Sequence, residues 1–96
     1  MQGPDSNSQD AELSRLTEEL KGMIVEVCDK DIAPESISDE ETLFGETARL
    51  ELDSLDGLQI SAEIQRRYGI RLSDPKEVRR LMTNVRTLAH YIAGRT

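Results

Sequence analysis

Apolar side chains recur every three or four residues along three stretches of this chain, which is the spacing of amphipathic helices. The stretches run from about residue 10 to 28, from 54 to 68 and from 85 to 92. No stretch alternates apolar and polar residues in the way that a half-buried strand does. The pattern therefore predicts an all-α fold in which three main helices form a bundle.

Residues that start and stop helices divide the second half of the chain. Asp53 is suited to cap the helix at 54–68, because its carboxylate can accept a first-turn N–H, and Gly69 is suited to end that helix. Ser73-Asp74-Pro75 predicts the start of a short helix at 76–82, since proline is tolerated in a first turn. The bundle therefore contains three main helices plus one short helix.

A long connection, from about residue 32 to residue 52, separates the first two main helices. An unsupported loop of about twenty residues is unusual in a compact domain, so we expect contacts that hold it to the core. Ser38 and Glu41 have the spacing of a capping box, which predicts one helical turn at 39–43. The apolar residues expected to pin the connection to the core are Ile37, Leu43 and Phe44.

The length of the chain suits one small domain, which we expect at residues 10–96. Residues 1–9 are polar and contain Gly, Pro and Ser, so we expect a disordered tail there. No apolar run is long enough to span a bilayer, and the first residues lack the basic and apolar regions of a signal peptide. The single cysteine, Cys28, has no disulfide partner in the chain, which suits a cytoplasmic location and a buried structural thiol.

The net charge of −7 is unevenly distributed along the chain. Residues 1–56 contain sixteen acidic and four basic side chains, whereas residues 57–96 contain three acidic and eight basic ones. Nucleic-acid phosphates would repel the acidic half, which argues against a nucleic-acid-binding protein. An acidic surface suits docking onto basic patches of partner proteins, although most of these charges also serve solubility.

Ser54 opens the second main helix within the run Leu52-Asp53-Ser54-Leu55-Asp56-Gly57-Leu58. No histidine, lysine or acid is arranged to make this serine a nucleophile, which argues against a hydrolase. A hydroxyl at a helix start lies near unpaired backbone N–H groups, where an attached phosphodiester gains favourable electrostatics. On position alone, Ser54 is either the attachment point for such a group or a residue that supports the helix cap.

Four motifs distributed along the chain resemble those of acyl carrier proteins. In chain order they are the loop signature Leu43-Phe44-Gly45, the attachment motif Leu52-Asp53-Ser54-Leu55-Asp56, the helix end Tyr68-Gly69-Ile70, and a final helix containing Val85 and Leu88 to Ile92. The resemblance covers nearly the whole domain, from about Leu13 to Ile92. It implies an acyl-carrier-like bundle of three main helices plus one short helix, with a long loop between the first and second helices.

By this resemblance, Ser54 receives 4'-phosphopantetheine from coenzyme A through a separate phosphopantetheinyl transferase that uses magnesium. The thiol of this arm then holds acyl groups as thioesters for fatty-acid, lipid or polyketide synthesis, and the chain itself is not an enzyme. Its other partners would be acyl-loading, condensing and acyl-transfer enzymes, which a monomer would visit in turn. The residues implied to dock onto partners are Asp53, Leu55, Asp56, Gln59, Glu63 and Arg66. The residues implied to line an acyl-chain pocket are Leu58, Ala62 and Ile64.

Several positions depart from the pattern of fatty-acid carriers. Gln59, Gln65 and Arg66 stand where those proteins usually have Glu, and Glu51 stands where Gly or Ala often precedes the attachment motif. Arg66 and Arg67 would repel a basic docking patch, and several such mismatches together can decide partner choice. We therefore expect a specialised carrier. An aminoacyl or peptidyl carrier and an unmodified acidic interaction module remain alternatives.

The remaining chemistry-bearing residues do not point to a metal or phosphate site. His90 has no Cys or second His nearby, and we expect it on the surface of the last helix. The acidic run at residues 39–41 lacks the alternating ligands and central glycine of a calcium loop. The sequence therefore predicts no metal ligand and no catalytic residue.

Overall fold

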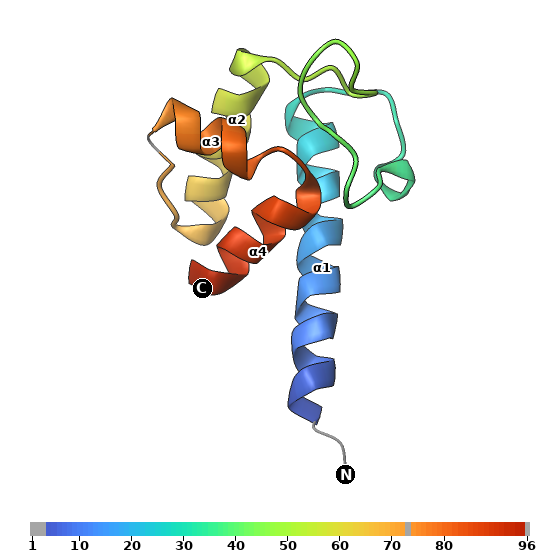
Figure 1. Ribbon diagram of the computed structural model, residues 1–96, viewed down its shortest axis with the longest axis vertical. Helices are drawn as coiled ribbons and strands as arrows, with labels where there is room; N and C mark the ends of the chain where they lie inside the picture. The colour runs from blue at the N-terminus through green and yellow to red at the C-terminus, as the bar shows by residue number, and fades with distance from the viewer. Residues whose placement is uncertain (1–3, 73, 96) are drawn as a thin grey trace.

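The fold is an all-α bundle of three main helices and one short helix, which confirms the fold class expected from the sequence (Figure 1). The computed structural model describes residues 4–72 and 74–95. The helices are α1 (Pro4–Val27), α2 (Ser54–Tyr68), α3 (Pro75–Leu81) and α4 (Val85–Arg95), with a 3₁₀ helix, η1, at Pro34–Ser36.

Helix α1 begins at Pro4, well before the start expected at Asp10. Proline suits a first turn because its missing N–H would have no partner there. Of the tail expected at 1–9, residues 1–3 lie outside the described residues, and the remainder belongs to α1. Figure 1 shows the first turns of α1 extending beyond the rest of the bundle.

The core forms where α1 packs against α2 and α4, while α3 closes the bundle by packing against α2 and α4. Burial of apolar surface from water stabilises this arrangement. The buried apolar side chains come from all four helices and from the loop: Leu20, Met23, Ile24, Ile37, Leu43, Ala48, Leu50, Leu52, Ile60, Ile64, Ile70, Leu81, Met82, Val85, Leu88, Ala89 and Ile92.

The helical turn expected at 39–43 is wrong: Asp39 and Glu40 form a turn, and the short helical segment η1 lies earlier in the loop. A helical turn here would need the N–H of Leu43 to bond the carbonyl of Asp39. Instead, Leu43 donates to the carbonyl of Thr83 at 3.1 Å, and the Asp39 carbonyl accepts from the N–H of Arg86 at 2.9 Å. Hydrogen bonds to the α3–α4 connection and to α4 thus replace the local helical one.

The loop is nevertheless held to the core, as its apolar residues predict. Ile37 and Leu43 are buried, and Phe44 is half-buried against the core. Backbone hydrogen bonds also join the two ends of the segment from Leu43 to Leu52. The N–H of Leu52 donates to the carbonyl of Leu43 at 3.1 Å, and the carbonyl of Leu52 accepts from the N–H of Gly45 at 3.2 Å. These bonds form a parallel bridge between Phe44 and Leu52, immediately before α2.

The ends of the helices follow the sequence signals closely. Gly69 ends α2 in the left-handed region, at φ 71°, which glycine adopts without a steric penalty. The carboxylate of Asp74 accepts the N–H of Lys76 at 3.0 Å and caps α3, and Asn84 accepts the N–H of Thr87 at 2.8 Å in the first turn of α4. Local side-chain acceptors therefore bond N–H groups in the first turns of α3 and α4, which would otherwise lack a partner.

Helix α2 buries a narrower face than its apolar pattern predicts. Three of its apolar residues, Leu55, Leu58 and Ala62, are exposed, Leu55 by 62% and Leu58 by 66%. The buried face consists of Gly57, Ile60, Ser61 and Ile64. Helix α1 and the short α3 pack against α2, and they cover only part of its circumference.

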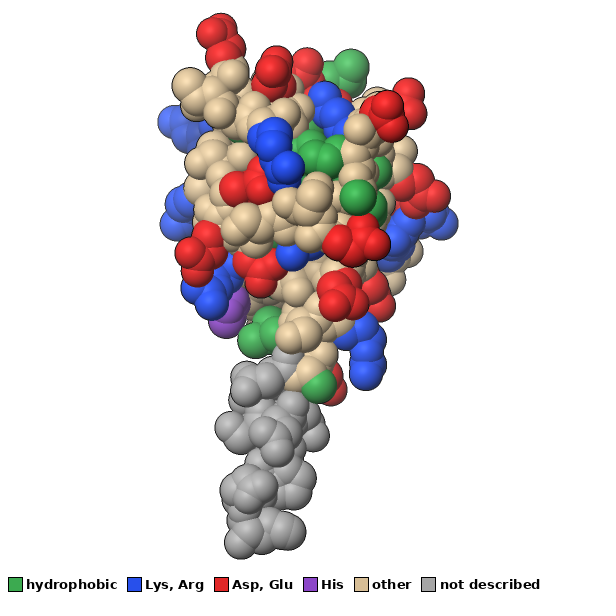
Figure 2. Space-filling model, turned by 90° about the vertical axis from the view of Figure 1, so that its right-hand side faces the viewer, with side chains coloured by type: hydrophobic (Ala, Val, Ile, Leu, Met, Phe, Trp, Pro, Cys, Tyr) green, Lys and Arg blue, Asp and Glu red, His purple; other side chains and the backbone are tan. Residues whose placement is uncertain are grey.

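Charged side chains of both signs are interspersed on the face of the molecule that carries α1 and the long loop (Figure 2). One ion pair there joins the two elements, since the Nζ atom of Lys21 lies 2.5 Å from a carboxylate oxygen of Asp39. In the part of the chain that the structure describes, none of the helices combines the length and the apolar character that crossing a membrane requires.

Leu52 and Leu55 lie on either side of Ser54 in the sequence and provide a matched test of which side chains are buried in the core. We expect Leu52→Ala to lower the free energy of unfolding by about 2–5 kcal/mol, because Leu52 is 2% exposed and its removal leaves a cavity. Leu55→Ala deletes the same atoms from an exposed position and should change it by less than about 0.5 kcal/mol. Urea unfolding followed by circular dichroism measures both, and equal losses would contradict the assigned packing.

Candidate functional site

Ser54 is the first residue of α2, and a reciprocal capping box holds it there. The N–H of Asp56 donates to the carboxylate of Asp53 at 3.0 Å, and the N–H of Asp53 donates to the carboxylate of Asp56 at 3.0 Å. Asp53 therefore caps α2, as the sequence predicts. Because both flanking residues are bonded to each other, the exposed Ser54 side chain is presented from a fixed stretch of backbone.

The charges around Ser54 match its place at a helix start. The hydrogen bond from the N–H of Asp56 holds the pKa of the Asp53 carboxyl below its usual range, and nearby Lys30 acts in the same direction. The positive end of the helix dipole also favours a negative group at this position. An anion attached here would meet backbone N–H groups and cations in addition to the carboxylates.

The residues around Ser54 do not form a nucleophile–base pair. Among residues 4–72 and 74–95, no hydrogen bond engages the Ser54 hydroxyl, and the one histidine of the sequence, His90, lies on the exposed side of α4. Burial, followed by the nearby Asp56 carboxylate, raises the pKa of the Cys28 thiol to about 12. Cys28 is therefore a protonated thiol at neutral pH, in agreement with a structural role.

A pocket of about 270 Å³ opens beside Ser54, between α2, α3 and the loop. Its residues come from three parts of the chain: Phe44; Ser54, Gly57, Leu58 and Ser61; and Leu72, Val78 and Arg79. The wall is mainly apolar, and Arg79 adds an exposed cation at its edge. A pocket of this kind can shelter an apolar chain that is attached at Ser54.

Of the three residues expected to line an acyl-chain pocket, the structure places only Leu58 in this wall. Ala62 is exposed and Ile64 is fully buried in the core, and neither lines the pocket. Their apolar character made them resemble lining residues, but the helix turns Ala62 toward solvent and Ile64 toward the core. A polar residue that the sequence analysis did not select, Ser61, lies in the wall instead.

The missed lining residues on α2, Gly57 and Ser61, share one signal. They follow Ser54 by three and seven residues, which places both on the helical face of Ser54, together with Leu58. A search restricted to this face would have found them, whereas a search for apolar residues could not. Phe44, Leu72 and Arg79 come from other elements, and only the folded chain brings them to this face.

The residues expected to dock onto partners lie at the start of α2 and along it, but four of them bond one another in two pairs, Asp53 with Asp56 and Glu63 with Arg66. Asp53, Leu55 and Gln59 are exposed, and Asp56 is half-buried in the capping box. Glu63 accepts hydrogen bonds from both Arg66 and Arg67, and these bonds, led by the one from Arg66, lower the pKa of its carboxyl. The docking residues expected from the sequence are Asp53, Leu55, Asp56, Gln59, Glu63 and Arg66. Of these, Glu63 and Arg66 form an ion pair with each other, which neutralises their charges.

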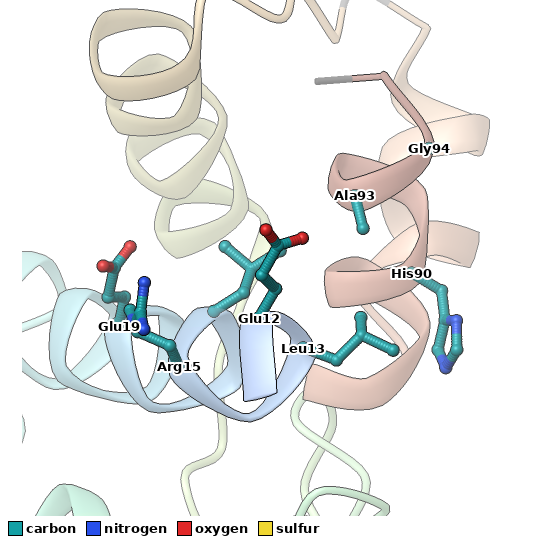
Figure 3. Close-up of a pocket in the computed structure, with 8 residues that line it drawn as sticks. Glu12, Leu13, Arg15, Glu19, His90, Ala93 and Gly94 are labelled. Carbon is teal, nitrogen blue, oxygen red and sulfur yellow. The ribbon is translucent and has the colours of Figure 1, made fainter. Parts of the chain in front are cut away.

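A larger hollow, of about 800 Å³, lies between the outer turns of α1 and the end of α4. Figure 3 shows Glu12, Arg15 and Glu19 projecting from α1, and Ala93 and His90 on α4. Its lining is largely polar and charged, and it does not include Ser54. Within the described residues, no group of three or more His, Cys, Asp or Glu side chains could hold a metal ion.

A small helical bundle that presents an exposed hydroxyl at a capped helix start, with no hydrogen bond from that hydroxyl to any described residue, has the architecture of a carrier domain. The family model for the phosphopantetheine attachment site matches residues 18–92, and the chain therefore belongs to this family. Its cofactor is covalently attached 4'-phosphopantetheine. Neither the curated proteins nor the solved structures contain a significant match.

The described residues fit this cofactor. A phosphodiester on the Ser54 oxygen would lie at the start of α2, where the helix dipole favours an anion, and Arg79 lines the pocket next to it. The apolar pocket next to it can accept the arm or a group that the arm holds. The site thus combines an anion-tolerant attachment point with a sheltered apolar space.

We expect acid to weaken the cap that Asp53 forms at the start of α2. Because the folded-state pKa of Asp53 is lowered, its stabilising contribution is fully present above the usual carboxyl pKa of about 4 and is lost as the pH falls through the folded-state value. Asp53→Asn keeps an acceptor oxygen but cannot be protonated. We expect the stability advantage of the wild type over Asp53→Asn to shrink between pH 6 and pH 3 in urea unfolding. A difference that is constant with pH would contradict the assigned interaction.

Proposed function

We propose that Ser54 is the attachment residue and that the chain carries acyl groups as thioesters on the thiol of its phosphopantetheine arm. The observation that carries this proposal is the exposed Ser54 hydroxyl, which lies beside the capping box and an apolar pocket and is hydrogen-bonded to no base among the described residues. A catalytic serine would need such a base. An attachment residue needs only access and a fixed position, and Ser54 has both.

In this proposal the side chains of the domain hold and shelter the attached group. Arg79 and the start of α2 would stabilise the negative charge of the phosphodiester. Phe44, Leu58 and Val78 would shield an apolar chain from water in the adjacent pocket. The domain itself would transfer no group, so loading and unloading would belong to partner enzymes.

The partners would be a phosphopantetheinyl transferase and enzymes that load, condense and transfer acyl groups. The exposed Leu55 lies next to Ser54 on α2 and offers an apolar anchor, and Asp53 adds a negative charge beside it. A partner with an apolar depression and a cation would complement both. We propose that the carrier acts as a monomer in the cytoplasm, where its single cysteine would remain a thiol.

We propose a specialised pathway rather than general fatty-acid synthesis, because α2 beyond its first turn presents little unpaired negative charge. Gln59 and Gln65 are uncharged, and Glu63 is engaged by Arg66 and Arg67. A partner that reads a row of acidic side chains would find few of them here. An aminoacyl or peptidyl carrier is the closest alternative, and it differs only in the group that the arm holds.

The attachment residue can be tested by intact mass. Incubation with coenzyme A, magnesium and a broad-specificity phosphopantetheinyl transferase should add one phosphopantetheine to the wild type and none to Ser54→Ala, with the helical circular dichroism unchanged. The matched control is Ser14→Ala, which removes an exposed hydroxyl from α1 and should leave the modification complete. Modification of Ser54→Ala would refute the attachment residue. An unmodified wild type, with the transferase active on a control carrier, would favour an unmodified interaction module.

The charge argument can be tested at Arg66, whose side chain is 71% exposed, rather than at Arg67, which also bonds Glu26 on α1. Arg66→Gln should tighten binding to a condensing enzyme with a basic docking patch by about 1.4- to 5-fold at low salt, because one exposed repulsion is removed. Arg15→Gln makes the same charge change on α1 and should have little effect. Fluorescence polarisation measures both affinities, and equal responses of the two variants would contradict a local role for Arg66.

A further inference from the structure

Helix α3 carries an exposed group of cations on its outer face. Arg79 and Arg80 follow Lys76 by three and four residues, so the three share one face of the helix, and all of them are exposed. The inner face is apolar, with Leu81 buried and Val78 half-buried against the core. The outward face of α3 is therefore basic, in a chain whose net charge is −7.

These cations have little compensation within the domain. Lys76 and Arg79 form no ion pair with any residue that the structure describes, and Arg80 pairs with Glu77 at 3.7 Å. Like charges three or four residues apart on a helix repel each other, and Lys76 stands in the first turn, near the positive end of the helix dipole. The fold gains nothing from this cation, so binding to a partner outside the domain is a better explanation for it.

The basic face borders the attachment site. Arg79 lines the pocket that also contains Ser54, so α3 stands beside the start of α2. In Figure 1 the long loop leads into α2 from the side of α1, and α3 lies on the other side. On the loop side, Glu51 and Asp53 are exposed close to Ser54 in the sequence. A partner that receives a group from Ser54 would therefore face acidic side chains on one side of the arm and basic ones on the other.

The size of the basic face indicates the kind of partner. A helix of seven residues is about 10 Å long, comparable with the distance of about 8 Å over which physiological salt screens charges. A membrane or a nucleic acid is a much larger polyanion, which the acidic side chains of the domain would repel. Segments that bind anionic lipids also contain about four to eight clustered cations. A small acidic patch on a folded protein, in contrast, can meet α3 alone.

We propose that the outer face of α3 is a second docking surface, which binds an acidic patch beside the active-site entrance of a partner enzyme. A cation of the same partner would face Asp53, so the two signs of charge would fix the orientation in which the enzyme approaches the arm. The proposal rests on the proposed function of Ser54. It specifies the partner as an enzyme whose entrance is acidic on the side of α3 and basic on the side of the loop.

The experiment compares two condensing enzymes of known structure, one with an acidic patch beside its entrance and one with a basic patch there. Fluorescence polarisation measures the affinity of the labelled carrier for each enzyme, both with and without the arm. The variant Lys76→Gln/Arg80→Gln retains Arg79 beside the pocket. It should weaken binding to the acidic entrance by about 2- to 30-fold at low salt, because two exposed charge pairs are lost, and it should not weaken binding to the basic entrance.

The matched control is Arg15→Gln/Arg95→Gln, which removes two exposed cations from α1 and from the end of α4 and should change neither affinity. Equal effects of the two double variants, an equal loss at both enzymes, or a wild type that does not bind the acidic entrance would overturn the inference. Binding to phosphatidylglycerol vesicles that depends on Lys76 and Arg80 would overturn it in favour of a membrane. Failure of attachment at Ser54, read from intact mass, would refute the proposed function alone, because the affinities without the arm still test α3.

Discussion

The two backbone hydrogen bonds that join Leu52 to Leu43 and to Gly45 fix the point at which α2 begins, and the site depends on that point. Leu43 also bonds the carbonyl of Thr83, so the same residue ties the loop to the connection between α3 and α4. Asp53 follows the joined segment directly and forms the capping box that presents Ser54. Ser54, the proposed attachment residue, is thus positioned by backbone bonds and a cap, and its own side chain makes no hydrogen bond to the described residues.

The helices were predictable because their causes are local. Apolar spacing defined the main helices, Asp53 defined the start of α2, and Gly69 defined its end through a left-handed conformation that favours glycine. The turn at 39–43 was not predictable, since distant residues compete successfully for its backbone hydrogen bonds. The exposed face of α2 was missed for a similar reason, because spacing indicates which residues can share a face but not how much of that face its neighbours cover.

The position of Ser54 at the capped start of α2 was predictable from the sequence, whereas the walls of the neighbouring pocket were not. A motif marks Ser54, whereas the pocket depends on which side chains meet across three elements. Gly57 illustrates the difference: a Cβ atom here would lie 3.4 Å from the ring of Phe44, in van der Waals contact, and only the folded chain brings the loop this close to α2. The basic residues near the end of α2 also have a local explanation, since Glu63 holds both and cations suit a helix C-terminus.

The closed end of the loop has a consequence for how this domain can diverge. Residues 45–51 form a loop whose two ends meet at the bridge between Phe44 and Leu52. Within this loop Ala48 and Leu50 are buried, while Glu46 and Thr47 are exposed at the tip. Because doubling the length of a flexible loop costs only about 0.6 kcal/mol, the tip can gain or lose residues without moving α2. Mutation can therefore remodel the surface next to the arm while the attachment chemistry is inherited unchanged, so new enzyme partnerships can evolve without a redesign of the site.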